Sequence, residues 1–223
     1  MNGIKAFIGK EVEVEISGKT FFNGILIDLG LDIIVLYDGW KFLYIPILHL
    51  HNIKERITVE NEQTEQPPDG TPFQPENETL SYRKVLTNAK GQFVEIYVTG
   101  NKSIHGYITS VLNDYIVFYS PVYKSLFISM QHLKWLTPYT TKLTPYTLKP
   151  EELPVVPSSI SLSRSYEEQI KKFKGQLIIF DMGDNPDKIG LLTELSNNIA
   201  EVVTASGKKV YWKLLHLKTV HLP

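Results

Sequence analysis

The segment GKEVEVEI at residues 9–16 has two near-copies further along the chain, GQFVEIYV at 91–98 and GQLIIFDM at 175–182. In each copy a glycine precedes apolar residues at every second position. Such alternation is typical of an antiparallel strand with one buried face. Glutamates separate the apolar residues in the first copy, whereas aromatic or aliphatic residues take some of these positions in the other two. The sequence therefore predicts three equivalent strands, and the second and third should have both faces covered.

Further landmarks recur at fixed distances from these strands. Fifteen residues after the first glycine of each copy stands a second glycine, and eight residues later an Asp or Asn. An aromatic residue and, five residues after it, a His-Leu pair close each copy. The three sets are Gly24, Asp32, Tyr44 and His49; Gly106, Asp114, Phe127 and His132; and Gly190, Asn198, Tyr211 and His216. The chain is thus predicted to contain three copies of one structural unit.

Each copy reads as four strands and a short fifth, separated by polar turns. Helical patterns precede two copies, at 80–86 and 165–173, and Ser165 is the expected N-cap of the second, with Glu168 three residues later. The predicted fold is mainly β, with three tandem small five-stranded Sm-like or SH3-like barrels, some with a short N-terminal helix. The second glycine of each copy fits a strongly bent second strand, where a side chain would obstruct closure.

Two proline-rich segments separate the copies. The first is acidic and poor in apolar residues, so we expect it to be extended and mobile. The second also contains tyrosines, leucines and valines, and we expect it to pack partly against a barrel. The predicted layout is a first barrel at 1–57, a linker at 58–79, a second barrel at 80–137, a linker at 138–160 and a third barrel at 161–223.

Composition excludes several classes of function. The net charge is −1 without a basic block, so non-specific nucleic-acid binding is not favoured. The chain has no cysteine, which excludes disulfides, thiolate nucleophiles and cysteine metal sites. No apolar stretch is long enough to span a bilayer, and the first ten residues lack a secretory signal pattern. We expect a protein made in the cytoplasm that is not inserted in a membrane.

The closing segments FISMQHLKWL, at 127–136, and YWKLLHLKTV, at 211–220, resemble the repeated module of the spore coat protein B family of endospore-forming bacilli. The first copy has His51 where the others have Lys134 and Lys218. The resemblance implies tandem Sm-like barrels and a structural role in the spore coat or exosporium. It also implies synthesis in the mother cell, with other coat proteins or further copies of the chain as partners. The serine- and lysine-rich tail of that family is absent from this sequence, so no role of such a tail is expected.

The equivalent histidines His49, His132 and His216 are the most distinctive polar residues. As zinc ligands they would have to converge from three barrels, and no further ligand recurs beside them. We therefore expect packed, hydrogen-bonded histidines, together with the structural glycines Gly24, Gly106 and Gly190. The pair His49 and His51 is also interpreted as structural, so no metal, cofactor or catalytic residue is predicted.

Catalysis is not expected, because the sequence has no nucleophile-elbow motif, phosphate loop or recurring acid and base. Sm-like RNA binding is the alternative function, since Asp32, Asp114 and Asn198 lie where Sm proteins hold a base. The Arg-Gly element of that pattern is missing, however. The preferred hypothesis is association between proteins, with Tyr97, Tyr107 and Tyr123 as the candidate contact residues.

Overall fold

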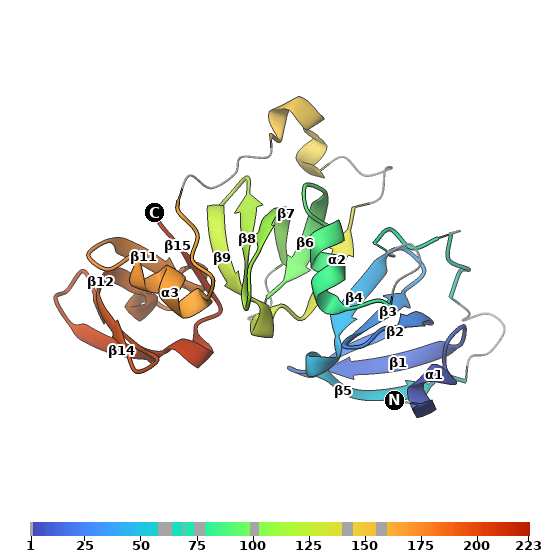
Figure 1. The fold of residues 1–223 in the computed structure, drawn as a ribbon. Coiled ribbons are helices and arrows are strands. Elements are labelled where there is room, and N and C mark those ends of the chain that lie inside the picture. The colour runs from blue at the N-terminus through green and yellow to red at the C-terminus, as the bar shows by residue number, and fades with distance from the viewer. Residues whose placement is uncertain are drawn as a thin grey trace.

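The computed structural model describes residues 2–57, 64–68, 70–73, 79–98, 103–139, 145–154 and 160–223. Within these ranges fifteen strands form one continuous antiparallel sheet, which confirms a mainly β fold. Figure 1 shows three groups of strands side by side, in chain order from one end of the molecule to the other. In the described part of the chain, no helix is long and apolar enough to cross a membrane.

The same order of elements occurs three times. The first unit contains α1 (Asn2–Lys5), β1 (Glu11–Ile16), β2 (Thr20–Leu29), β3 (Ile33–Tyr37), β4 (Phe42–Pro46), η1 (Ile47–His49) and β5 (Leu50–Glu55). The second contains α2 (Tyr82–Asn88), β6 (Phe93–Tyr97), β7 (Ser103–Val111), β8 (Tyr115–Ser120), β9 (Lys124–Ser129), η3 (Met130–His132) and β10 (Trp135–Pro138). The third contains α3 (Tyr166–Lys171), β11 (Leu177–Phe180), β12 (Ile189–Ser196), β13 (Ile199–Val203), β14 (Lys209–Lys213), η8 (Leu214–His216) and β15 (Thr219–His221). Short 3₁₀ turns also occur between units, at η4 (Pro145–Thr147) and η5 (Pro150–Glu152), and inside the third unit, at η6 (Asp181–Gly183) and η7 (Pro186–Lys188).

Strand pairing is also the same in the three units. The first strand of each unit pairs with the second and the fifth, and the remaining strands follow in chain order. The sheet continues from one unit to the next because β4 pairs with β10 and β9 pairs with β15. The fourth strand of one unit therefore always joins the fifth strand of the following unit.

The second strand of each unit bends at an equivalent place. Its register against the third strand shifts two to four residues after the central glycine, between Leu26 and Asp28, Ile108 and Ser110, and Leu192 and Glu194. Such β-bulges kink and twist a strand. At the glycines themselves an added Cβ would collide with a backbone carbonyl oxygen of the third strand, at Tyr37, Tyr119 and Val203 respectively. Only a residue without a side chain allows the two backbones to approach this closely.

The two longer helices begin at serine caps. The Ser81 side chain accepts a hydrogen bond from the Lys84 N–H, and Ser165 accepts one from the Glu168 N–H. This confirms the N-cap predicted at Ser165. Each helix buries an apolar face, which in α3 includes Tyr166 and Ile170.

The apolar core crosses the unit boundaries. One cluster joins Ile33 and Tyr44 of the first unit to Leu86 of α2. Another joins Tyr115 and Phe127 of the second unit to Ile170 of α3. The helices α2 and α3 thus each pack in a core shared with the preceding unit.

Parts of both linkers lie outside the described residues, but the described parts are informative. In the first linker Phe73 is fully buried and packs on the Tyr44 ring, with centroids 5.3 Å apart. The expectation of a linker without packing is therefore wrong at this residue. In the second linker Leu153 is buried and its carbonyl accepts a hydrogen bond from the Tyr107 hydroxyl at 2.8 Å. The prediction that this linker packs against a unit is confirmed.

The first strands of the second and third units are expected to have both faces covered, and this is so for the second unit only. Phe93 in β6 meets the rings of Tyr107, Tyr139 and Tyr146, so its face is covered by the linker. The corresponding Leu177 in β11 is 59% exposed. The prediction is therefore wrong at Leu177, whereas Ile179 in the same strand is partly buried and lies near Gly183 of η6.

Candidate association surfaces at the unit junctions

The two junctions are built from the same strands in the same register. At the first, Leu136 of β10 lies opposite Tyr44 of β4. At the second, Val220 of β15 lies opposite Phe127 of β9. Leu136 and Val220 each lie four positions after the histidine of their own unit. Tyr44 and Phe127 each lie five positions before the histidine of the preceding unit. The repeat therefore encodes how units join as well as how each one folds.

An aspartate of each unit holds the helix of the next. The Asp32 carboxylate accepts a hydrogen bond from the Tyr82 N–H at 2.7 Å, and Asp114 accepts one from the Tyr166 N–H at 2.8 Å. Tyr82 and Tyr166 are the first residues of α2 and α3, where backbone N–H groups lack partners inside the helix. A carboxylate at this end also interacts favourably with the helix dipole.

The three equivalent histidines have different environments. His49 is buried, and its Nδ1 lies 3.2 Å from the Ser17 hydroxyl. The His132 Nε2 lies 2.8 Å from the carbonyl oxygen of Leu215 in the third unit. His49 lies against the backbone of Gln131, the residue corresponding to Leu215, although its Nε2 makes no hydrogen bond of good geometry. His216, which no described unit follows, is exposed.

Burial controls the protonation of the two histidines at the junctions. It lowers the pKa of His49 to about 4, and the nearby positive charge of Lys134 acts in the same direction. It also lowers the pKa of His132, against the opposing effect of the Leu215 carbonyl. Both rings are therefore neutral near pH 7, as a buried hydrogen-bonding residue requires.

Further contacts at the first junction come from β10 and the residue before it. The Lys134 Nζ donates to the Ser17 carbonyl at 2.6 Å. Trp135 stacks on Tyr97 with ring centroids 3.9 Å apart and meets the edge of Phe22 at 5.0 Å. These contacts give the first junction an apolar centre with polar contacts around it, as in many protein–protein interfaces.

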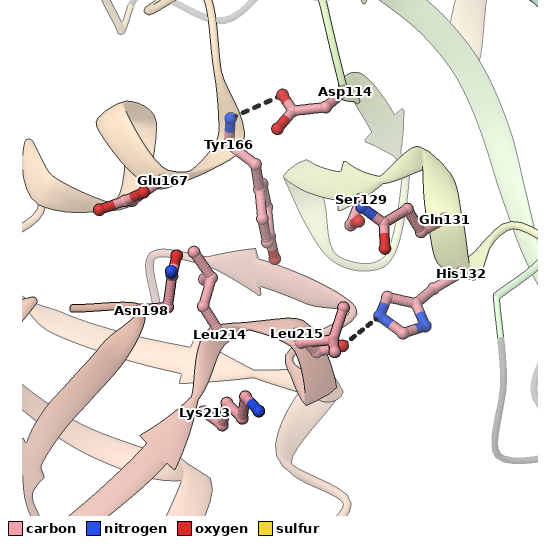
Figure 2. Close-up of a pocket in the computed structure, with 10 residues that line it drawn as sticks. All are labelled: Asp114, Ser129, Gln131, His132, Tyr166, Glu167, Asn198, Lys213, Leu214 and Leu215. Atoms are coloured by element: carbon pink, nitrogen blue, oxygen red, sulfur yellow. Dashed lines mark hydrogen bonds between the residues drawn. The ribbon is translucent and has the colours of Figure 1, made fainter. Parts of the chain in front are cut away.

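A cleft of about 310 Å³ opens at the second junction (Figure 2). Its walls come from Asp114, Ser129, Gln131 and His132 of the second unit and from Tyr166, Glu167, Asn198, Lys213, Leu214 and Leu215 of the third. Figure 2 shows Asp114 bonded to Tyr166 and His132 bonded to Leu215. The aspartate and the histidine thus both hold backbone groups of the next unit. Among the described residues, no three His, Cys, Asp or Glu side chains gather as metal ligands would.

The predicted contact tyrosines all make contacts inside the chain. Tyr97 is buried against Trp135, Tyr107 bonds to Leu153, and Tyr123 lies beside the His221 ring at 6.0 Å between centroids. Their contact with another protein stays a prediction. Sequence reasoning did not identify the junction role of Asp32 and Asp114, because their partners lie about fifty residues further on.

Comparisons with known proteins place the chain in a family. The third unit, at residues 165–220, matches the sequence profile described as the YwrJ third domain. Over 227 aligned residues that cover both chains fully, the sequence is 57% identical to the uncharacterized protein YwrJ of Bacillus subtilis strain 168. It is also 28% identical over 144 residues to spore coat protein B of the same strain, an alignment that covers 65% of this chain and 36% of that protein. The chain belongs to the YwrJ family.

Proposed function

We propose that this protein is a structural component of the spore coat that acts by association between proteins and not by catalysis. The observation that carries the proposal is the pair of junctions, at which equivalent strands, aspartates and helices join successive units in one way. A protein built around a repeated docking surface is suited to assembly. The partial similarity to spore coat protein B supports the coat as the place where it acts.

The proposed fold of each unit is an Sm-like barrel. Three features support it: the strand order five-one-two-three-four, the bulged second strand with its obligatory glycine, and the 3₁₀ turn between the fourth and fifth strands. Small barrels of this kind leave strand edges that need partners. The two junctions show such edges in use within one chain.

The polar groups of the junctions support a structural role over an enzymatic one. Asp114 and His132, which line the cleft, are engaged with backbone groups of the next unit. RNA binding is disfavoured by the same geometry. Asp32 and Asp114, which lie where Sm proteins hold a base, accept hydrogen bonds from helix N–H groups instead.

Localisation during sporulation tests the coat role. We expect a fluorescent fusion, expressed in a sporulating Bacillus from its own promoter, to move from the mother-cell cytoplasm to the surface of the forespore. Extracts of the coat from washed, purified spores should contain the chain. A fusion that stays diffuse in the mother cell, together with coat extracts free of the protein, would refute the proposal. The free fluorescent protein is the control.

A further inference from the structure

Two strands of the described sheet have a neighbour on one side only. β14 pairs with β13, and β5 pairs with β1. Their equivalents in the middle of the chain pair on both sides, since β14 corresponds to β4 and β9, and β5 to β10 and β15. One end of the molecule thus presents the surface that receives a following unit, and the other end presents the surface that joins a preceding one (Figure 1).

The residues of the edge strands β14 and β5 are less buried than those of the equivalent strands inside the sheet. All five residues of β4 are buried, whereas none of the five in β14 is. All residues of β10 and β15 are buried, whereas none of the six in β5 is. Strands with equivalent places in the repeat therefore differ in burial according to whether a neighbouring unit covers them.

The β14 end exposes apolar side chains at junction positions. Tyr211 is 61% exposed, while its equivalents Tyr44 and Phe127 are at most 1% exposed. Ile199 is 45% exposed, while its equivalents, Ile33 and Tyr115, are fully buried. Both Tyr211 and Ile199 line a shallow hollow of about 220 Å³. A partner that covers this end would bury them as the internal junctions bury their equivalents.

The β5 end presents the matching half of a junction. Ile53 is partly exposed, while its equivalents Leu136 and Val220 are buried. Ile4 in α1 and Phe7 just after it are also partly exposed, in contrast to the buried apolar faces of α2 and α3. The two ends of one chain thus carry the strands that form the two sides of each internal junction.

We propose that these ends join head to tail, with β14 of one copy paired antiparallel to β5 of a second copy. This inference deepens the proposed function, since it rests on association through junctions and names a second copy as one partner. In the register of the internal junctions, Ile53 of one chain lies opposite Tyr211 of the other, as Leu136 lies opposite Tyr44. The same register places Glu55 opposite Lys209, which adds an attraction between opposite charges.

The contact between copies is weaker than the internal junctions. Glu201 replaces the buried Val35 and Val117 at the centre of the outer face, and it binds the Lys209 ammonium at 3.0 Å. Lysines on an edge strand also limit pairing with other chains. The contact therefore forms at high local concentration and dissociates on dilution. Because it is heterologous, it generates a closed ring or an open filament, depending on the rotation between copies.

Sizing of the purified full-length chain tests the association. We expect its mass by light scattering to rise with concentration, and Tyr211→Arg and Ile53→Arg to raise the concentration required by at least about tenfold. Val122→Arg is the matched control, because Val122 is 62% exposed on the turn before β9 and away from both edges. Thermal unfolding verifies that the variants fold. A mass of one chain at every concentration, or arginine variants that associate like the natural protein, overturns the proposal.

Cysteine pairing tests the register, and the chain helps because it contains no cysteine. Residues directly opposite in antiparallel strands have Cα atoms about 4.5–5.5 Å apart, within the range of a disulfide. An oxidised mixture of Ile53→Cys and Tyr211→Cys chains should give a cross-linked heterodimer, and a mixture of Ile53→Cys and Val122→Cys should not. Cross-linking of Tyr211→Cys chains only with each other would indicate a symmetric contact and contradict the head-to-tail pairing.

The two proposals fail separately. A protein that stays monomeric in solution but reaches the spore surface would remove the head-to-tail contact and leave the coat role. A protein that associates through Ile53 and Tyr211 but never reaches the spore would support the head-to-tail contact and refute the coat role. Tyr211→Arg tested in sporulating cells connects the two, because loss of the spore-surface signal in that variant alone would show that assembly is needed for localisation.

Discussion

The Asp114 carboxylate accepts a hydrogen bond from the Tyr166 N–H, and this contact ties the turn of one unit to the helix of the next. The same contact joins Asp32 to Tyr82. A turn residue, which in an isolated unit would only shape a loop, thus sets the position of a helix about fifty residues later. Asn198 has the equivalent place in the third unit and is exposed.

Replacing Asp114 with Ala should destabilise the second junction. The change removes a hydrogen bond to a helix N-terminus and a favourable charge near the helix dipole, which together contribute about 1–2 kcal/mol. Chemical denaturation followed by tryptophan fluorescence measures the loss. Asn198→Gly is the control, because Asn198 is exposed and has a left-handed φ of 61° that glycine also adopts, and it should leave the free energy of unfolding unchanged within about 0.5 kcal/mol. Equal losses in the two variants would show that the aspartate acts only inside its own turn.

Replacing Gly106 with Ala should destabilise the second unit more strongly. The new Cβ would collide with the Tyr119 carbonyl oxygen, so the second and third strands would have to separate. A cost of about 3 kcal/mol or more is expected, beyond that of most single substitutions. The control is Gly3→Ala, where a Cβ meets nothing within 4 Å. A melting temperature of Gly106→Ala equal to that of the control would contradict the close approach of the two strands.

Much of this architecture could be predicted from the sequence because the relevant signals are local. Alternating apolar residues identified the first strands, and Ser165 identified the start of a helix. The features that the sequence did not predict depend on contacts between residues that are far apart in the chain. Tyr44 and Tyr211 are the same residue at the same place in the repeat, yet one is 1% and the other 61% exposed. The following unit and Phe73 of the linker cover Tyr44, whereas no described unit follows Tyr211.

Phe73 shows a second limit of sequence reasoning. Its neighbours are acidic and proline-rich, so composition predicts a segment without packing. A single aromatic side chain can still bury enough apolar surface to anchor such a segment, and here Phe73 packs on Tyr44 while its N–H donates to the Tyr44 hydroxyl at 3.1 Å. Averaged composition does not reveal an anchor of one residue.

The third unit contains a buried ion pair whose loss should be costly. The Asp181 carboxylate binds the Lys188 ammonium and accepts hydrogen bonds from the N–H groups of Lys218 and Thr219. Burial alone would lower the pKa of Lys188, but Asp181 and Asp184 outweigh it and raise that pKa. Asp181→Ala leaves a buried ammonium with only the more exposed Asp184 beside it, so we expect a loss of about 3 kcal/mol. Asp184→Ala, the control, should cost less than about 1 kcal/mol in the same denaturation experiment.

Acid should weaken the first junction through His49. Burial holds the pKa of this ring at about 4 in the folded chain, against about 6.5 when unfolded. Between these values the unfolded chain binds the proton and the folded chain does not, so stability falls as the pH drops from 6.5 towards 4. Over this pH range the free energy of unfolding falls by about 3 kcal/mol because of His49 alone. Burial also lowers the pKa of His132, which adds to the loss.

The variant His49→Gln isolates this contribution, since glutamine is polar but does not titrate in this range. It should be less stable than the natural chain at pH 7, where it loses a fitted side chain, and the difference should shrink as the pH is lowered to 4.5. Free energies of unfolding from urea titrations at pH 7, 6, 5 and 4.5 measure both slopes. His216→Gln is the control, because His216 is exposed and no described unit contacts it as the following units contact His49 and His132. If the free energy of unfolding depended on pH in the same way for the natural chain and for His49→Gln, His49 would titrate alike in the folded and unfolded states. Burial would then not lower its pKa, and the explanation of the acid sensitivity would be wrong.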